Sequence, residues 1–164
     1  MIRQVNEKDI AELADIYNYY IENTVVSYEE AVLGKEEMQD RVNAVLEAGY
    51  PWLVADEDGR LVGYCYAYAW NQRVAYRHTA EITVYLLPQA TGQGWGTLLY
   101  QSLFEALKAR GIRSVVGGIG LPNPASIALH EKMGLKKVAH FERVGYKFDQ
   151  WLDVGYWQGD LQEI

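Results

Sequence analysis

The sequence lacks the features that define several large classes of protein. Cys65 is its one cysteine among 164 residues, which excludes a disulfide framework within the chain and a zinc cluster built from cysteines. No apolar run approaches the roughly 20 residues that a membrane-spanning helix needs, and the first residues show no signal-peptide pattern. The formal net charge is -7 and no basic stripe is visible, which argues against a nucleic-acid partner. We therefore expect a cytoplasmic protein without a membrane or nucleic-acid partner.

Aromatic residues, by contrast, are abundant. The chain has 13 tyrosines and 5 tryptophans, more than a core of this size usually needs, so we expect some of them to line a pocket or a subunit interface. The predicted strand over residues 61–70 has small residues on one face and an aromatic row on the other, formed by Tyr64, Tyr66, Tyr68 and Trp70. The small face favours the close approach of a helix, and the aromatic face favours a cleft or an interface.

The hydrophobic pattern predicts a single α/β domain over residues 1–164. Asp58-Gly59 is a hairpin signal between two strands, and no repeat or linker interrupts the chain. Strands are expected near residues 2–5, 52–55, 61–70, 79–86, 114–119, 137–144 and 151–158, and helices after Asn6, over 35–48, over 94–110 and between Asn123 and Gly134. Because this order mixes hairpins with crossovers, we expect a mixed, mostly antiparallel sheet with helices on both faces.

Residues 79–107 carry the strongest functional signal. A strand with an alternating pattern over residues 79–86 leads to a glycine-rich turn over residues 92–96, and an amphipathic helix follows at once. Bare N–H groups at such a helix N-terminus suit a phosphate group. The glycine spacing does not match a dinucleotide fingerprint, and no Lys-Ser/Thr pair completes a Walker loop. The alternative is that the glycines only form a tight turn between strand and helix.

Two motifs make the sequence recognisable. Residues 88–99, PQATGQGWGTLL, resemble the acetyl-CoA pyrophosphate loop of the GCN5-related N-acetyltransferase (GNAT) superfamily. Residues 123–135 look like the closing motif of the same superfamily. Further stretches resemble its phosphinothricin and methionine sulfoximine acetyltransferase branch, namely residues 16–18, 23–24, 49–55, 75–77, 81–85 and 144–153. The similarity covers essentially the whole chain.

The resemblance implies the acyl-CoA N-acyltransferase fold, in which the strands at 79–86 and 114–119 splay apart and admit the pantetheine arm of acetyl-CoA. A freed main-chain N–H near Val84 and Leu86 would then polarise the thioester carbonyl. The residues implied for acetyl-CoA binding are Val84, Tyr85, Leu86, Gly92, Gln93, Gly94, Trp95, Gly96, Thr97, Asn123 and Ser126. Asn123 could instead only cap its helix. Where the superfamily loop usually begins with Gln or Arg, this chain has Thr91, so we expect weaker acetyl-CoA binding without its loss.

Glu81 and His130 are the catalytic residues that the resemblance implies. An amine arrives protonated, and a carboxylate beside aromatic rings could take its proton directly or through a water. The alternative for Glu81 is an ion pair with Arg73 or Arg77. His130 stands where most of the superfamily has a tyrosine that protonates the departing thiolate, and an imidazolium can do the same. The alternative for His130 is a capped or helix-surface side chain.

The acceptor is expected to be a small amine with an acidic group, because arginine suits bidentate recognition of a carboxylate or phosphinate. The residues implied for the acceptor are Arg73, Tyr76, Arg77, Thr83 and Tyr85. Cys65 falls on the small face of its strand and is a poor nucleophile, so we expect direct transfer of acetyl to an α-amino group in a ternary complex.

Two alternative functions stay open at this point. One is acetylation of another amine, such as a polyamine, an aminoglycoside or a peptide N-terminus. The other is a non-catalytic acyl-CoA-binding sensor, for which Thr91 is the one hint. No metal is expected. Lys147 and Trp151 resemble residues near the subunit interface of the branch, so we expect a homodimer.

Overall fold

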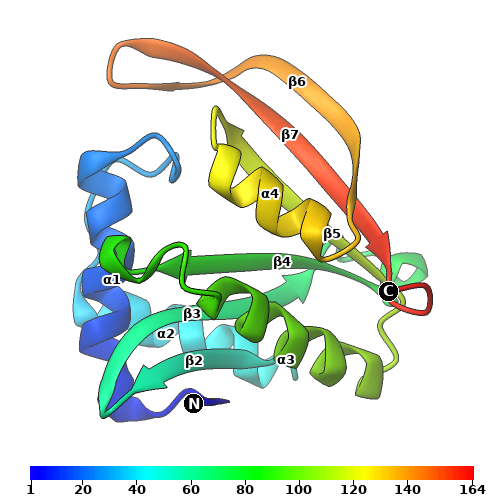
Figure 1. The fold of residues 1–164 in the computed structure, drawn as a ribbon, viewed down its shortest axis with the longest axis horizontal. Coiled ribbons are helices and arrows are strands. Elements are labelled where there is room, and N and C mark those ends of the chain that lie inside the picture. The colour runs from blue at the N-terminus through cyan, green and yellow to red at the C-terminus, as the bar shows by residue number, and fades with distance from the viewer.

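The computed structural model describes residues 1–164 as a seven-stranded sheet with helices packed against it (Figure 1). The strands are β1 (Ile2–Gln4), β2 (Trp52–Glu57), β3 (Arg60–Ala69), β4 (Thr79–Leu86), β5 (Ser114–Leu121), β6 (Lys136–Lys147) and β7 (Gln150–Asp160). The α-helices are α1 (Ile10–Asn23), α2 (Lys35–Glu47), α3 (Trp95–Ala109) and α4 (Pro124–Lys132), and three short 3₁₀ turns are η1 (Glu7–Asp9), η2 (Val74–Tyr76) and η3 (Pro88–Ala90). No helix has the length and apolarity needed to cross a membrane.

The strand order in the sheet is β1-β2-β3-β4-β5-β7-β6. All neighbouring strands are antiparallel except β4 and β5, which are parallel. The parallel pair needs a crossover connection, and α3 supplies it. The predicted mixed, mostly antiparallel sheet is therefore confirmed.

The two faces of β3 pack against different helices. On the small face, the Cys65 thiol lies 3.5 Å from the Leu99 carbonyl oxygen of α3, so the predicted close approach of a helix is confirmed. On the aromatic face, Tyr64 lies opposite Tyr85 of β4, and the Tyr85 ring is 5.1 Å from the Tyr17 ring of α1. Since successive residues of a strand point to opposite faces, α1 and α3 cover opposite sides of the sheet. Helices on both faces are thus confirmed as well.

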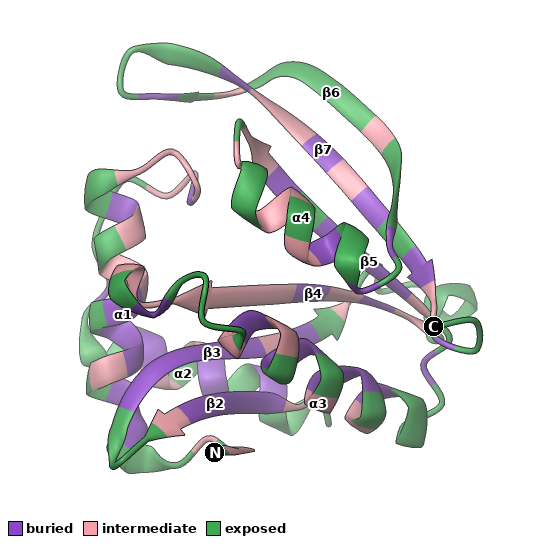
Figure 2. Ribbon diagram, viewed as in Figure 1, coloured by how far each residue is buried: buried purple, intermediate pink, exposed green.

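The hydrophobic core lies where these layers meet. Figure 2 shows buried residues concentrated along β2 and β3 and on the inward sides of α1 and α3, while much of β6 is exposed. Removing this apolar surface from water is the main favourable term in folding. The half of the sheet formed by β1 to β4 is therefore packed more thoroughly than the half that contains β6, and it supports the side chains of β4.

Local signals set several element boundaries. Asp58 and Gly59 both have positive φ angles, 51° and 86°, and form the two-residue hairpin turn predicted between β2 and β3. The Asn123 side chain caps α4, and Gly134, with a φ of 90°, follows its end as predicted. Strands β6 and β7 run further toward their shared turn than predicted. Phe148 and Asp149 form this turn with positive φ angles, and no glycine in the sequence signals it.

Candidate active site

β4 and β5 pair only at one end. Their register joins Thr79 to Ser114 and ends with Glu81 opposite Val116, after which β4 continues against β3 and β5 continues against β7. The two strands therefore splay apart beyond Glu81, as expected. A cavity of about 770 Å³ occupies this region, and both strands contribute to its lining. The main chain of residues 82–86 has no partner on β5.

Glu81 lies at the apex of the splay, on the cavity wall. Burial raises the pKa of its carboxyl group, and the Tyr68 hydroxyl on the facing strand opposes that rise. Neither Arg73 nor Arg77 forms an ion pair with it. A carboxylate in this environment can accept a proton from an amine near neutral pH.

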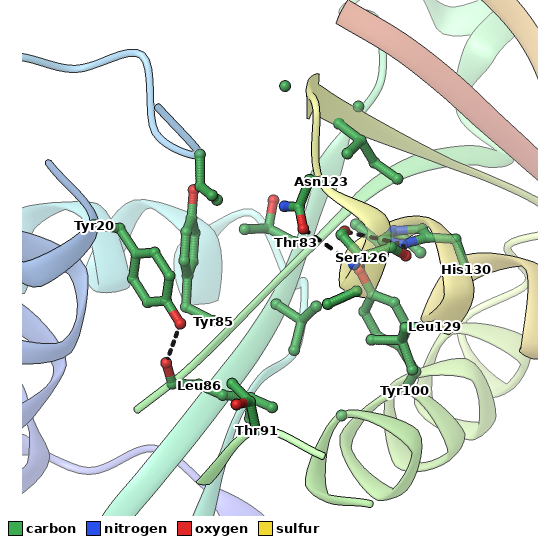
Figure 3. Close-up of a pocket in the computed structure, with 18 of the residues that line it drawn as sticks. Tyr20, Thr83, Tyr85, Leu86, Thr91, Tyr100, Asn123, Ser126, Leu129 and His130 are labelled. Atoms are coloured by element: carbon green, nitrogen blue, oxygen red, sulfur yellow. Dashed lines mark hydrogen bonds between the residues drawn. The ribbon is translucent and has the colours of Figure 1, made fainter. Parts of the chain in front are cut away.

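A tyrosine of α1 contacts the splayed end of β4. Thr83, Val84, Tyr85 and Leu86 line the cavity, and the Tyr20 hydroxyl donates a hydrogen bond to the Leu86 carbonyl oxygen (Figure 3). This contact ties α1 to the outer end of the splayed strand. It leaves main-chain N–H groups of this segment available to an acyl oxygen in the opening.

The glycine-rich turn forms the mouth of the cavity on the α3 side. Gly92, Gly94, Gly96 and Thr97 line it, and a Cβ atom added at Gly92 or Gly94 would meet nothing within 4 Å. Gly92 and Gly94 have φ angles of 74° and 88°, in the left-handed region that favours glycine. The predicted loop residues Gln93 and Trp95 do not line the cavity, and the Gln93 amide nitrogen donates to the Gln89 carbonyl oxygen instead.

The Thr91 side chain forms its hydrogen bond within its own turn. Its hydroxyl donates a hydrogen bond of 2.8 Å to the Pro88 carbonyl oxygen, although the residue also lines the cavity. The loop therefore offers an anion its main-chain N–H groups and the N-terminus of α3, with no cationic side chain from the turn itself.

α4 supplies the opposite wall of the opening. Asn123 accepts a hydrogen bond of 3.2 Å from the Ser126 N–H, so its cap role is present, and both residues also line the cavity. The Leu129 side chain packs against Gly96 of α3, where an added Cβ would be 3.0 Å from a Leu129 methyl group. This close approach holds the starts of α3 and α4 together.

His130 is buried between α4, α3 and β5. Its Nδ1 lies 2.7 Å from the Ser126 carbonyl oxygen and its Nε2 lies 3.1 Å from the Tyr100 hydroxyl, so both ring nitrogens have partners. A Cβ at Gly117 would lie 2.6 Å from Nε2, which explains why a glycine faces this ring. Burial lowers the pKa of His130, so the neutral imidazole predominates at pH 7. Figure 3 shows His130 and Tyr100 side by side at the cavity wall.

The residues predicted from sequence to hold the acceptor are not all brought together. Thr83 and Tyr85 line the cavity, whereas Arg73, Tyr76 and Arg77 do not. These three lie in or beside the 3₁₀ turn η2, where an Arg77 guanidinium nitrogen donates 3.0 Å to the Val74 carbonyl oxygen. The cavity lining contains no arginine at all.

Sequence reasoning did not single out most of the aromatic lining. Besides Tyr85, seven further tyrosines line the cavity: Tyr17, Tyr20, Tyr28, Tyr66, Tyr68, Tyr100 and Tyr156. The alternating row on β3 was the available signal for Tyr66 and Tyr68, because it indicated a cleft. The positions of the other five depend on contacts between segments distant in sequence.

The loop between α1 and α2 closes the end of the cavity near Tyr28. The Tyr28 hydroxyl donates a hydrogen bond of 2.7 Å to the Asp153 carbonyl oxygen, and Lys147 Nζ donates one of 2.6 Å to the Ser27 carbonyl oxygen. Burial lowers the pKa of Lys147, which is 1% exposed. Gly120 and Gly145 make room for the Tyr28 ring, since an added Cβ at either would lie within 2.8 Å of it. β5, β6 and β7 thereby hold this loop against the sheet.

The chain is similar in sequence and in structure to known acetyltransferases. The sequence model of the acetyltransferase (GNAT) domain matches residues 2–155. A phosphinothricin N-acetyltransferase of Streptomyces viridochromogenes is 39% identical over 161 residues, which cover 98% of this chain and 87% of that protein. An L-methionine sulfoximine/L-methionine sulfone acetyltransferase of Salmonella typhimurium is 32% identical over 162 residues, or 99% of this chain and 95% of that protein.

A solved structure agrees with these sequence matches. The crystal structure of a GNAT superfamily phosphinothricin acetyltransferase from Sinorhizobium meliloti, in complex with acetyl-CoA, superimposes with a TM-score of 0.94 at 35% identity. The match covers 98% of this chain and 87% of that chain.

Proposed function

This chain belongs to the GNAT acetyltransferase family, and we propose that it transfers acetyl from acetyl-CoA to the α-amino group of a small acceptor of the phosphinothricin or methionine sulfoximine type. The observation that carries this proposal is the splay of β4 from β5 with Glu81 at its apex. A thioester lying in that opening would stand within reach of an amine beside the one carboxylate of the cavity. A cytoplasmic location is part of the same proposal.

Acetyl-CoA would bind mainly through the main chain. The turn at Gly92 and Gly94 and the N-terminus of α3 suit the pyrophosphate, because both present N–H groups to open space. The pantetheine arm would lie between β4 and β5, where Asn123, Ser126 and residues 84–86 all line the cavity. The residues present therefore fit this co-substrate.

The reaction would proceed by direct attack. The Glu81 carboxylate takes a proton from the acceptor ammonium, and the free amine attacks the thioester carbonyl carbon. Main-chain N–H groups near Val84 and Leu86 stabilise the charge that develops on the carbonyl oxygen. The new N–C bond forms as the C–S bond breaks, the nitrogen loses its second proton to solvent, and no acyl-enzyme is needed. Cys65 suits this route, since it is buried and burial raises the pKa of its thiol.

The thiolate must then gain a proton, and we assign this step to His130 acting through Tyr100. In the imidazolium form, Nε2–H donates to the Tyr100 hydroxyl, which passes its own proton to the departing sulfur. The contact of Nδ1 with the Ser126 carbonyl oxygen fixes the ring for this transfer. Because burial lowers the pKa of His130, the imidazolium is a minor species at pH 7.

A second acceptor class has one observation in its favour. The cavity lining includes Glu81, eight tyrosines and one lysine, Lys132, but no arginine, an environment that suits a cationic amine as well as an amino acid. If Arg73, Tyr76 and Arg77 take part in recognition, as the resemblance implies, they act from outside the present lining.

The homodimer is proposed from the β6–β7 hairpin. Large apolar side chains on it are half exposed or more: Val138, Phe141, Val144, Tyr146, Phe148 and Trp151. A contiguous exposed apolar surface commonly marks an interface between proteins. Light scattering coupled to size-exclusion chromatography tests this, and Trp151→Glu should shift the population towards a monomer.

A thiol-release assay tests the function. Acetyl-CoA is mixed with phosphinothricin, methionine sulfoximine, a polyamine, an aminoglycoside and a short peptide, and free coenzyme A is measured for each. The proposal expects the two amino-acid-type acceptors to give the highest kcat/KM, with Glu81→Gln as the matched inactive control. Highest kcat/KM with the polyamine or aminoglycoside would favour the second class. Acetyl-CoA binding without thiol release from any amine would contradict both.

A further inference from the structure

Tyr68 stands directly opposite Glu81. The register of β3 against β4 pairs Tyr68 with Glu81, and the neighbouring pair on the same face is Tyr66 with Thr83. Directly opposed residues of antiparallel strands have Cβ atoms only about 4.5–5.5 Å apart. Both side chains line the cavity, and Tyr68 is 36% exposed. The phenol and the carboxylate therefore meet at the point where β5 separates from β4.

Every neighbour that faces the Glu81 carboxylate is uncharged. β3 contributes Tyr66 and Tyr68, and β5 contributes Gly118, where an added Cβ would be 3.6 Å from Glu81 Oε1. β7 contributes Tyr156, whose ring lies beside Gly118. No arginine, lysine or histidine pairs with this carboxylate. Its ionised form thus depends on hydrogen bonds and on residual contact with water.

We propose that Tyr68 is a positioning residue for Glu81, whose carboxylate accepts a hydrogen bond from the Tyr68 hydroxyl and is thereby held ionised at the apex of the splayed strands. The inference rests on the proposed role of Glu81 as the base. Tyr68 itself exchanges no proton with the acceptor. It opposes the effect of burial, which raises the pKa of the carboxyl group and so disfavours its ionised form.

The ring of Tyr68 is held independently of its hydroxyl group. It lies 5.9 Å from the Tyr66 ring, and the Tyr66 ring stacks on Trp52 at 4.1 Å. Tyr68→Phe keeps these aromatic contacts and removes only the donor. The variant should therefore fold, and an unchanged thermal unfolding midpoint would verify this.

The test is the pH profile of kcat/KM for Tyr68→Phe. Loss of a donor to a carboxylate raises the pKa of Glu81, so the acidic limb of the profile should move to higher pH by up to about one unit. Activity should fall up to about tenfold on that limb and return to the wild-type value at higher pH. The KM for acetyl-CoA should stay unchanged. The inference would be overturned if the acidic limb did not move. It would also be overturned if a folded Tyr68→Phe variant did not regain the wild-type kcat/KM at high pH.

Two comparison variants separate the inference from its premise. Tyr156→Phe removes a phenol on β7 that is paired with Gly118 and not with Glu81 in the sheet, so it should leave the acidic limb in place. In a Glu81→Gln background, Tyr68→Phe should cause no further loss of rate, because Tyr68 acts through Glu81. If Glu81→Gln is inactive and Tyr68→Phe has an unshifted limb, only the inference fails. If Glu81→Gln keeps the wild-type rate, the premise and the inference fail together.

Discussion

The two halves of the cleft are built from different parts of the chain. The half proposed for acetyl-CoA consists largely of main chain: the turn at 92–94, the first residues of α3 and the freed edge of β4. The half proposed for the acceptor consists of side chains, namely Glu81 and tyrosines from α1, β3, β4 and β7. A main-chain site tolerates many sequence changes as long as the backbone geometry persists. A side-chain site changes its ligand with single substitutions, which explains why the cofactor class is easier to identify from sequence than the acceptor.

The comparison predicts that one substitution in the acceptor half has the largest effect on the rate of acetyl transfer. Glu81→Gln keeps the size of the side chain but cannot accept a proton, so kcat should fall by about 10²- to 10⁴-fold, the usual contribution of a general base. Because the coenzyme half does not use this side chain, the acetyl-CoA Kd should be unchanged. Steady-state kinetics and calorimetric titration measure the two quantities. A rate near that of the wild type would remove Glu81 from the mechanism.

His130 is the exception on the coenzyme side, because there a side chain is essential to the packing. His130→Leu leaves the buried Tyr100 hydroxyl without a partner and should lower the free energy of unfolding by about 1–3 kcal/mol at pH 7. The pKa of His130 is lowered in the folded state, so the unfolded chain binds more protons, and wild-type stability falls as pH drops below about 6.5.

The stability difference between wild type and His130→Leu should therefore narrow as pH falls from about 7 towards 5. Denaturant unfolding at several pH values measures it. A difference that widens towards acid pH would show that the native state favours the imidazolium form, contrary to the burial of this ring.

Gly94→Ala tests the main-chain half through the backbone alone. An added Cβ would touch nothing, but the φ of 88° is unfavourable for alanine and costs about 1–2 kcal/mol. We expect roughly a five- to tenfold rise in the acetyl-CoA Kd as the loop relaxes. Gln93→Ala is the matched control, since it removes a side chain from the same turn and keeps its N–H group. Equal losses in the two variants would contradict a main-chain site.

The smallest expected effect concerns Thr91. Thr91→Arg adds a cation beside the proposed pyrophosphate site, where an exposed charge pair contributes about 0.2–1 kcal/mol, so the acetyl-CoA Kd should fall by up to about fivefold. The gain should shrink at high salt. If the wild type binds acetyl-CoA as tightly as Thr91→Arg does, the main-chain N–H groups alone account for the affinity.

Sequence patterns predicted the parts of the fold that depend on local chemistry. The Asp58-Gly59 turn, the Asn123 cap and the amphipathic α3 all follow from residues within a few positions of each other. The position of Glu81 on the cleft side of β4 followed from strand alternation together with the resemblance. The exact point where β4 leaves β5 did not, because pairing depends on which main-chain groups find partners in space.

Contacts that the residue pattern does not reveal account for what the sequence could not predict about the site. Arg77 was expected at the acceptor, but the η2 turn directs its guanidinium to the Val74 carbonyl oxygen three residues back. Tyr28 enters the cavity because Gly120 and Gly145, far along the chain, leave space for its ring. Lys147 is buried within the chain by its bond to Ser27, although a subunit interface was expected nearby. No local pattern encodes the pairings of Tyr28 and Lys147, which join segments far apart in the sequence.

The pair of adjacent glycines in β5 limits how the length of this strand can change. Gly117 gives space to the His130 ring on one side of the strand, and the adjacent Gly118 gives space beside the Glu81 carboxylate on the other. Because consecutive strand residues face opposite ways, inserting or deleting one residue here would bring a neighbour of the glycine pair into one of the two spaces. The length of this strand is therefore as tightly constrained as the identity of its two glycines.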